Sequence, residues 1–347
     1  MPADLTQSHR IDPAALPEET VIFGSTSAMR SIRKRIDRAL SSDDPVLIRG
    51  ESGTGKEVVA RFIHARSNRG EAPFVKVNCA TFRAALLESE LFGYQKGAFV
   101  EAREDRSGLI ELANGGTLFL DQVGELDAKI QNKILHLLQH GSFIRVGGGE
   151  ERPACVRLIC ATSADLESAT NAGVFRDDLL RRVTGLSLHL AALRDRKTDV
   201  PQLCEYFMQK LARQFERKAP HLDEPTLRLL MEWDWPGNIR ELENWVARAV
   251  ILGDTAPLTA ELRRRLSTSI AHKQRPAGAG AFKEISRPSG PTATSAVILR
   301  ALRANRWNRR KTAEDLNMSY RAFLYKLREV GLPHRRRGHR DFPPTAG

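Results

Sequence analysis

A glycine-rich segment at residues 50–57, GESGTGKE, restricts the fold of this chain more than any other feature. It directly follows the apolar run PVLIR at residues 45–49 and leads into the helical pattern EVVARFIHARS at residues 57–67. In such a strand–loop–helix, glycines let backbone N–H groups turn toward phosphates, the helix N-terminus adds its positive end, and a lysine reaches the terminal phosphates. The segment therefore predicts a nucleotide-binding phosphate loop made of Gly50, Glu51, Ser52, Gly53, Thr54, Gly55, Lys56 and Glu57.

Glu57 is a departure from the usual phosphate-loop pattern, which has Ser or Thr after the lysine. The hydroxyl that ordinarily helps to hold magnesium is therefore missing at this position. A glycine turn with a purely structural role is the alternative interpretation, but the flanking strand and helix favour a phosphate site.

Three further apolar runs, at residues 73–79, 116–121 and 156–163, have the composition of short buried strands, and amphipathic helical patterns accompany them. This arrangement predicts an α/β fold with a largely parallel sheet over residues 21–193. Residues 194–262 show only helical patterns and predict a smaller all-helical domain. Residues 1–20 are polar, contain three prolines and are expected to be disordered. All four cysteines lie in or beside apolar segments and are expected in the core.

The run at residues 116–121, GTLFLD, ends in Asp121, where a carboxylate at the carboxyl end of a parallel strand can hold magnesium directly or through water. Gln122 follows, at a position where many nucleotide-hydrolysing proteins carry a glutamate that activates water. An amide cannot take up that proton, so hydrolysis is expected to be weakened. The alternative is that Gln122 orients the water by hydrogen bonding.

The positive charge of the chain is concentrated near its C-terminal end. The net charge is +12, and residues 263–347 contain 20 Lys and Arg but 5 Asp and Glu. This asymmetry favours nucleic acid as a partner for that part, and a solvated basic tail is the alternative. Residues 263–293 are rich in Pro, Gly, Ala and Ser and predict a flexible linker. The sequence has neither a secretory signal pattern nor a run of 18 apolar residues, so a cytoplasmic protein without membrane contact is expected.

Several motifs together resemble the AAA+ domain of sigma-54-dependent transcriptional activators. They are GESGTGKE, SELFGYQKGAFVEA, GGTLFLDQVGEL, VRLICATSADL, FRDDLLRRV and WPGNIRELEN, and they stand in the order of that family. The resemblance covers about residues 21–332. It implies an AAA+ P-loop sandwich with a helical lid, binding of ATP and Mg²⁺, assembly into rings that are usually hexamers, and remodelling of RNA polymerase held inactive by sigma-54.

The resemblance also implies roles for individual residues. Lys56 would bind phosphate, Asp121 would hold magnesium and Arg240 would sense the nucleotide from the lid. Asn78 would couple the catalytic position, here Gln122, to the nucleotide state. Arg176 and Arg182 would be arginine fingers that reach the ATP of a neighbouring subunit, and guanidinium groups suit the charge that develops on a γ-phosphate.

The segment GAFVEA at residues 97–102 corresponds to a loop that reads GAFTGA in this family and touches sigma-54. Phe99 is kept, whereas Val100 replaces the threonine and Glu101 replaces the second glycine. Valine has no hydroxyl to donate, and glutamate adds charge and a Cβ where glycine moves freely. The sigma-contact loop, which comprises Gly97, Ala98, Phe99, Val100, Glu101 and Ala102, is therefore expected to engage sigma-54 less well.

Residues 294–332 resemble the Fis-type helix-turn-helix of these activators. The second helix of the pair would offer its polar face to a major groove of double-stranded DNA. The predicted DNA-binding residues are Ser319, Tyr320, Arg321, Tyr325, Lys326 and Arg328. The basic tail at residues 333–347 would add phosphate contacts.

These inferences predict an ATP-binding, DNA-binding regulator whose hydrolysis and sigma-54 contact are weakened. It would form a homo-oligomeric ring or a mixed ring with a related activator. Two alternatives stay open: a conventional activator ATPase that remodels sigma-54 polymerase, and a passive DNA-binding repressor.

Overall fold

The structure is a computed structural model that describes residues 8–81 and 84–273, together with Thr312 and Phe323. Contacts divide the chain into two units, Met1–Leu266 and Ser267–Gly347. No helix within the described ranges is long and apolar enough to cross a membrane. The six predicted DNA-binding residues and the basic tail lie outside the described residues. Phe323, which is described, is helical and fully buried.

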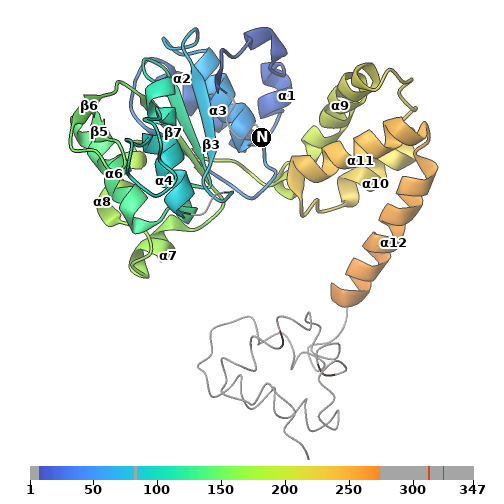
Figure 1. The fold of residues 1–347 in the computed structure, drawn as a ribbon. Helices are drawn as coiled ribbons and strands as arrows, with labels where there is room; N and C mark the ends of the chain where they lie inside the picture. The colour runs from blue at the N-terminus through green and yellow to red at the C-terminus, as the bar shows by residue number, and fades with distance from the viewer. Residues whose placement is uncertain (1–7, 82–83, 274–311, 313–322, 324–347) are drawn as a thin grey trace, which may run out of the picture. The chain divides into compact units, whose positions relative to one another are not determined.

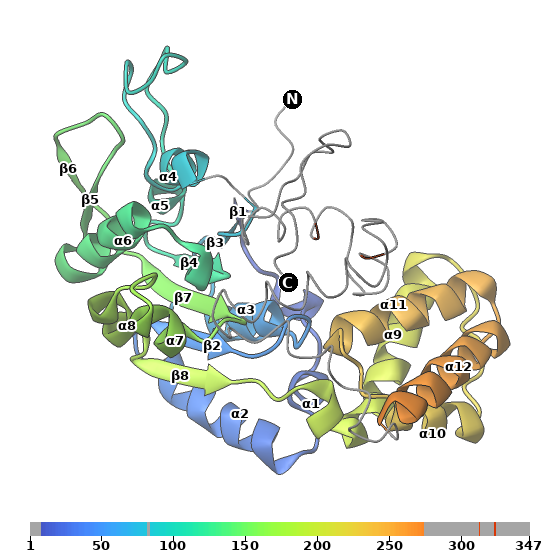
Figure 2. The same ribbon diagram turned by 90° about the horizontal axis from the view of Figure 1, so that it is seen from below.

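A six-stranded sheet forms the centre of the first unit (Figure 1), and its strands follow the order β1-β3-β4-β7-β2-β8, as Figure 2 shows. Its members are β1 (Ser8–His9), β2 (Val46–Arg49), β3 (Phe74–Asn78), β4 (Thr117–Asp121), β7 (Arg157–Thr162) and β8 (Leu186–His189). All neighbours pair in parallel except β1, which is antiparallel to β3. The predicted α/β fold with a largely parallel sheet is confirmed.

Helices cover both faces of this sheet, which explains why its central strands are apolar without alternation. All six residues of β7 are buried. One face packs against α1 (Glu19–Phe23), α2 (Ser27–Leu40) and α3 (Lys56–Ala65). The other packs against α4 (Ala84–Phe92), α5 (Leu109–Leu112), α6 (Ala128–His140), α7 (Leu166–Asn171) and α8 (Asp177–Val183). Because the strands are parallel, their carboxyl ends meet at one edge of the sheet.

A hairpin and short 3-10 turns complete the part of this domain that the structure describes. The short strands β5 (Ser142–Ile144) and β6 (Glu151–Pro153) form an antiparallel hairpin after α6. Four 3-10 turns connect the larger elements: η1 (Pro13–Ala15), η2 (Val123–Glu125), η3 (Leu193–Asp195) and η4 (Lys197–Asp199). The turns η3 and η4 carry the chain from β8 into the helical domain.

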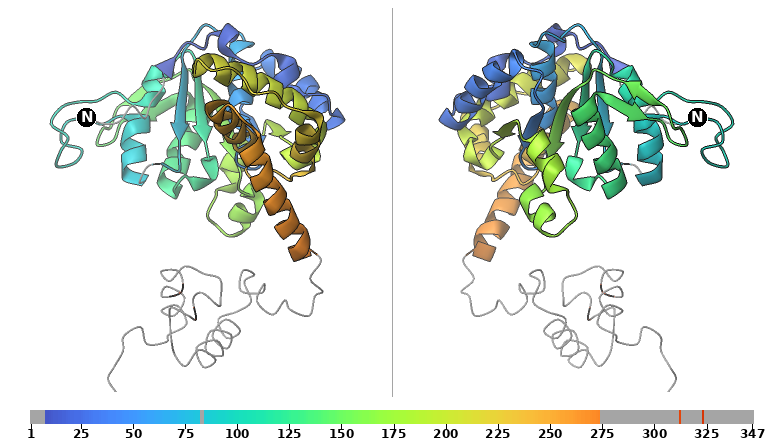
Figure 3. Two further views of the ribbon diagram at one scale, coloured as in Figure 1. Left: turned by 90° about the vertical axis from the view of Figure 1, so that its right-hand side faces the viewer. Right: turned by 90° about the vertical axis from the view of Figure 1, so that its left-hand side faces the viewer.

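The helical lid contains α9 (Val200–Gln214), α10 (Glu224–Glu232), α11 (Asn238–Leu252) and α12 (Ala256–Lys273). Its core gathers around buried apolar side chains such as Leu230, Leu242 and Val246. The expected start of a flexible linker at residue 263 is wrong, because α12, orange in Figure 3, continues to Lys273. Leu262 is 4% exposed and packs in the lid core, so the helix is already anchored where the linker was expected to begin.

The expected disorder of residues 1–20 is also wrong from residue 8 onward. Asp12 caps η1 by accepting a hydrogen bond from the backbone N–H of Ala14 at 2.9 Å, and Pro13 has the fixed φ that suits the start of a turn. Ile11 is 8% exposed and packs in the core beneath the sheet. A single buried side chain and a two-residue edge strand leave no periodic pattern in the sequence.

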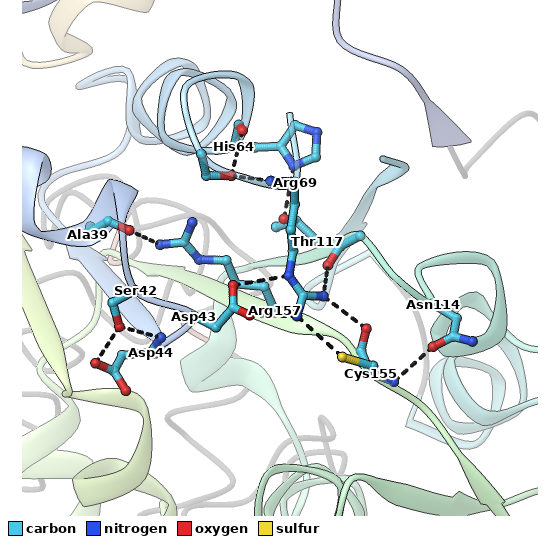
Figure 4. A network of polar contacts seen from close by, with 12 residues as sticks. Ala39, Ser42, Asp43, Asp44, His64, Arg69, Asn114, Thr117, Cys155 and Arg157 are labelled. Carbon is cyan, nitrogen blue, oxygen red and sulfur yellow. Dashed lines mark hydrogen bonds and ion pairs between the residues drawn. The ribbon is translucent and has the colours of Figure 1, made fainter. Parts of the chain in front are cut away.

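A polar network joins the amino ends of the strands, at the edge opposite their carboxyl ends (Figure 4). Arg69 donates to both carboxylate oxygens of Asp43, at 3.1 and 2.8 Å, and to the carbonyl oxygens of Gly116 and Cys155. Its Nη2 lies 3.3 Å from Cys155 Sγ. The buried Arg157 donates to the carbonyl of Ala39 at 2.5 Å. These bonds fasten the turn after α2 to β4 and β7 and therefore support the sheet.

Cys155 corrects the expectation that all four cysteines are core residues. Cys79, Cys160 and Cys204 are buried, but Cys155 is exposed. It lies just before β7, where its backbone N–H donates to Asn114 Oδ1 at 2.8 Å and the side chain faces outward. Its apolar sequence neighbours, Ala154 and Val156, pack in or against the core, whereas the Cys155 side chain does not.

Candidate nucleotide site

The predicted phosphate loop lies between β2 and α3, at the carboxyl edge of the sheet. Gly53 and Gly55 adopt φ values of +81° and +93°, in the left-handed region that favours glycine. A Cβ on Gly53 would lie 2.3 Å from the carbonyl oxygen of Gly237 in the lid. The glycine pattern therefore reflects both the curl of the loop and its close approach to a second element.

Lys56 begins α3 and reaches back across the loop. Its Nζ donates to the carbonyl oxygens of Gly50 and Glu51, at 2.8 and 2.9 Å. The side chain is 6% exposed, and this burial lowers the pKa of Lys56, an effect that Asp121 opposes. The ammonium group thus lies at the helix N-terminus, where a phosphate group would be bound.

Asp121 and Asn78 end neighbouring strands and lie directly opposite each other in the β3–β4 register. Burial raises the pKa of Asp121, and the positive charge of Lys56 opposes this shift. The Oδ1 atom of Asn78 accepts a hydrogen bond from the backbone N–H of Ala80 at 3.0 Å. A carboxylate within the field of Lys56, at the edge of the phosphate loop, is the donor type that magnesium prefers.

Gln122 follows Asp121 in a left-handed backbone conformation, with φ 60° and ψ 49°. Such a conformation is uncommon for a residue other than glycine, and it turns the side chain out of the strand. Its Oε1 accepts a hydrogen bond from Ser163 Oγ at 3.1 Å. The amide oxygen is therefore engaged, and the amide NH₂ can only donate.

Glu57 is held by two cations. Its Oε2 lies 2.6 Å from Lys76 Nζ, and its Oε1 lies 2.9 Å from Arg61 Nη2. Burial alone would raise the pKa of Glu57, but its bonds to Lys76 and Arg61 outweigh burial and lower it. The carboxylate that stands where a hydroxyl was expected is charged and committed to these partners.

A cavity of about 240 Å³ extends from the phosphate loop. Its polar lining includes Lys56, Asp121, Gln122, Arg240, Lys210 and Glu243. Its apolar lining comes from three parts of the chain, namely Pro17, Val21, Ile22 and Met29 between β1 and β2, Val58 and Val59 in α3, and Leu203, Tyr206, Phe207 and Ile239 in the lid. The lining therefore combines polar groups that suit phosphates with apolar side chains that suit a nucleobase.

The N-terminal end of α11 closes the cavity from the lid side. Arg240 Nη1 donates to Ser52 Oγ at 3.1 Å, and the Arg240 backbone N–H donates to the carbonyl of Gly53 at 3.3 Å. The predicted nucleotide-sensing arginine therefore touches the phosphate loop. Two neighbours in this contact, Asn238 and Arg194, were not predicted. Asn238 lies in the WPGNIREL motif two residues before Arg240. This position in the motif is the sequence feature that could have indicated a role for Asn238 in the contact.

Arg176 and Arg182 are associated with α8, as the N-cap residue and as a residue of its last turn. Arg176 forms an ion pair with Asp178 at 2.5 Å, and Arg182 Nη2 donates to the carbonyl oxygen of Leu138 at 2.9 Å. These partners lie outside the cavity of the same chain. The structure therefore does not bring the two predicted fingers to the phosphate loop that Lys56 and Asp121 share.

Residues 97–102 form the tip of the long segment between α4 and α5, which extends beside the β5–β6 hairpin in Figure 2. The Gly97 N–H donates to the Ala102 carbonyl at 2.8 Å, and the Ala102 N–H donates to the Phe99 carbonyl at 2.9 Å. Phe99 packs edge-on against Tyr94, with ring centroids 4.8 Å apart. Val100 is fully exposed. The tip is closed by its own hydrogen bonds and presents an apolar side chain to solvent.

The phosphate loop, the parallel sheet with an aspartate at its carboxyl edge, and the helical lid define an AAA+ nucleotide-binding protein. Residues 22–189 match the Sigma-54 interaction domain, and residues 194–279 match the AAA+ ATPase lid domain. Residues 295–329 match the Fis family of bacterial regulatory proteins. The chain belongs to the family of sigma-54-dependent transcriptional regulators.

Individual relatives agree with this assignment. The regulatory protein AtoC of Escherichia coli (strain K12) is 41% identical over 317 residues, which cover 90% of this chain and 68% of AtoC. The Nif-specific regulatory protein of Azotobacter vinelandii is 38% identical and is matched over 92% of this chain and 60% of its own length. NtrX from Brucella abortus, solved in complex with ATP, superposes with a TM-score of 0.63 at 33% identity, over 89% of this chain and 69% of NtrX.

Proposed function

We propose that this chain is an ATP-binding, DNA-binding transcription regulator of the sigma-54-activator type, with weakened ATP hydrolysis and weakened sigma-54 contact. The observation that carries the proposal is the amide of Gln122 beside an otherwise complete phosphate site. Lys56, Asp121 and Arg240 line one cavity, which supports nucleotide binding, whereas the amide of Gln122 cannot accept a proton.

ATP is the proposed ligand, because the cavity is lined by the phosphate loop and by apolar side chains. Asp121 would hold Mg²⁺ together with phosphate oxygens, which is an ordinary arrangement for this ion. Glu57 is already paired with Lys76 and Arg61 and would not serve as a second ligand. NtrX of Brucella abortus, a relative with the same fold, has been solved with ATP, which supports this choice.

Weak hydrolysis follows from the chemistry of the Gln122 side chain. Removal of a proton from the attacking water needs a group that can accept it, and a positioned base contributes about 10²–10⁴-fold. The Gln122 oxygen is bonded to Ser163, and its NH₂ group can only donate. Gln122 would therefore help to hold ATP without activating water.

Assembly into a ring would give Arg176 and Arg182 a role across the subunit boundary. Both guanidinium groups are held by residues outside the cavity of their own chain. In a homo-oligomeric ring they would complete the neighbour's site. In a mixed ring with a related activator they would serve an ATP molecule whose own subunit carries the catalytic glutamate.

Contact with sigma-54 would depend on the tip formed by residues 97–102. Phe99 is partly covered by Tyr94, so the residue that projects is Val100, and Glu101 adds a negative charge beside it. Double-stranded DNA is the proposed partner of residues 294–332, with Arg321 and Lys326 among the contacts. Arg321→Ala should cost about 1–3 kcal/mol of specific binding if it reads a base.

The proposal is tested by measuring ATP binding and phosphate release on the same preparations of wild-type chain and Lys56→Ala. We expect the wild type to bind ATP with Mg²⁺ and to release phosphate only slowly, and Lys56→Ala to lose binding. Wild-type protein that does not bind ATP would refute the proposed ligand. Wild-type protein that releases phosphate rapidly would refute the proposed weakening.

A second candidate is a conventional activator ATPase, favoured by the bond between Gln122 and Ser163, which could hold an amide in place to orient water. Fast phosphate release together with opening of sigma-54 promoter complexes would establish it. A passive repressor is a third candidate, and it predicts that Lys56→Ala leaves regulation intact.

A further inference from the structure

Asn238 combines three features that are unusual in one residue. It is fully buried, it begins α11, and its backbone has φ 54° in the left-handed region. Asparagine tolerates this conformation better than most residues with a side chain, but the conformation still carries a cost. A buried asparagine held in this way needs strong compensation from its hydrogen bonds.

The side chain of Asn238 makes three hydrogen bonds, two to the phosphate loop and one to η3. Its Nδ2 donates to Glu51 Oε2 at 3.1 Å and to the Ser52 carbonyl at 3.0 Å. Its Oδ1 accepts from the backbone N–H of Leu193 at 2.8 Å. Donor and acceptor are therefore both used, and they join α11 to the phosphate loop and to η3.

An ion pair joins two of these three segments, η3 and the phosphate loop. Arg194 in η3 donates to both carboxylate oxygens of Glu51, at 2.8 and 2.5 Å. Together with Asn238, it lowers the pKa of Glu51 to about 2, with the Arg194 bond as the larger cause. One carboxylate of the phosphate loop is thus held from the connecting turn and from the lid at once.

The backbone contact beside Asn238 leaves no free space. Gly53 and Gly237 approach so closely that a Cβ on Gly53 would lie 2.3 Å from the Gly237 oxygen. The next contact is the bond from the Arg240 N–H to the Gly53 carbonyl. A shift of the N-terminal end of α11 would therefore displace the phosphate loop or break these bonds.

We propose that Asn238 is a positioning residue for nucleotide binding, which holds the phosphate loop, η3 and the lid in one arrangement with the Glu51–Arg194 pair as its second anchor. Binding of the nucleotide to the phosphate loop then stabilises the docked lid, and docking of the lid stabilises the bound nucleotide. This inference rests on the proposed ATP binding. Aspartate could not replace Asn238, because it lacks the donor and would bring a second carboxylate to Glu51.

A role limited to the folding of the lid is the competing explanation. It is disfavoured because two of the three side-chain bonds of Asn238 end in the phosphate loop and not in the lid. The two explanations predict different responses to glycine at residue 238. Glycine keeps the left-handed backbone without strain and removes only the side-chain bonds.

The test uses the full chain with Asn238→Gly and titrates mant-ATP in the presence of Mg²⁺. We expect binding to weaken about 10- to 100-fold, as the loss of two or three hydrogen bonds implies. The matched control is Asn244→Gly, an exposed position in the interior of the same helix. It weakens α11 without touching the phosphate loop and should leave the affinity for mant-ATP unchanged.

Hydrogen exchange supplies a second readout. In the wild type, ATP should protect residues 50–56 and residues 237–241 together, and in Asn238→Gly it should no longer protect the second segment. Arg194→Gln should change affinity in the same direction by a smaller factor, because that pair is partly exposed. If Asn238→Gly does not fold, the Arg194→Gln variant tests the inference in its place.

Three outcomes would overturn the inference. They are unchanged affinity and unchanged protection in Asn238→Gly, an equal loss of affinity in Asn244→Gly, and no change in Arg194→Gln when Asn238→Gly is unfolded. A wild-type chain that binds no mant-ATP would instead refute the proposed function, so the two failures are distinguishable.

Discussion

Replacement of Gln122 by glutamate exchanges the side-chain NH₂ group for an oxygen and leaves the backbone of the site in place. In the Gln122→Glu variant, Ser163 Oγ can still donate to one side-chain oxygen, as it does now at 3.1 Å. The second oxygen is then free to accept a proton from water. We therefore expect ATP turnover to rise by about 10²–10⁴-fold, which corresponds to about 3–5 kcal/mol of activation free energy.

The assay is steady-state phosphate release at saturating ATP and Mg²⁺, with mant-ATP affinity measured in parallel. Affinity should change little, because in the proposed site the phosphates would be held mainly by the loop that ends at Lys56. Ser163→Ala in the Gln122→Glu background is the matched control and should reduce the gain by about 3- to 10-fold, as the loss of one orienting hydrogen bond implies. Asp121→Asn should abolish the gain if Asp121 holds the metal.

Equal turnover in wild type and Gln122→Glu would refute this reasoning if the wild-type rate is already fast. It would mean that the amide, held by Ser163, orients water well enough for hydrolysis. Equal but slow turnover would place the defect elsewhere, for example in assembly, and the Gln122 interpretation would again fail.

Three further predictions concern assembly, the loop and pH. Mixing Arg182→Ala with Lys56→Ala chains should restore part of the ATP-dependent activity at shared interfaces, and no recovery in co-assembled rings would show that Arg182 acts within its own chain. In a chain that hydrolyses ATP, Val100→Thr with Glu101→Gly should increase opening of sigma-54 promoter complexes in a transcription assay, and no increase would remove the loop as the cause. Burial lowers the pKa of His64 to about 4 in the folded chain. In the unfolded chain His64 has its ordinary pKa near 6.5, so below that pH the unfolded chain takes up a proton that the folded chain does not. Urea unfolding should therefore show stability falling by about 2 kcal/mol between pH 7 and pH 5, and His64→Leu should flatten this slope unless another group causes it.

Much of the central fold was predictable because its signals are local. The strands β2, β4 and β7 contain continuous apolar runs, β3 is interrupted only by Lys76, and the glycine spacing before Lys56 reports a backbone conformation directly. Asp121 was found because its position at the end of an apolar run gives its place at the sheet edge.

The contacts that the sequence did not indicate join residues far apart in the chain. Asn238 bonds to Ser52, 186 residues away, and Arg194 pairs with Glu51, 143 residues away. No periodicity connects such positions, and a single asparagine or arginine has many possible partners. The short strand β8 and the ordered residues before α1 were missed for a related reason, since two to four residues are too few to establish a pattern.

Cys155 gives the unmodified chain a single accessible point for thiol chemistry. Burial raises the pKa of Cys160 and of Cys204 to about 12 and that of Cys79 well above its ordinary value, so these thiols stay protonated and shielded. Cys155 lies instead on the surface, at the edge of the sheet opposite the phosphate loop. A maleimide dye would therefore attach once per chain, away from the proposed ATP site. A second dye on a cysteine added to the lid would allow energy transfer to report whether the lid changes its distance from the sheet.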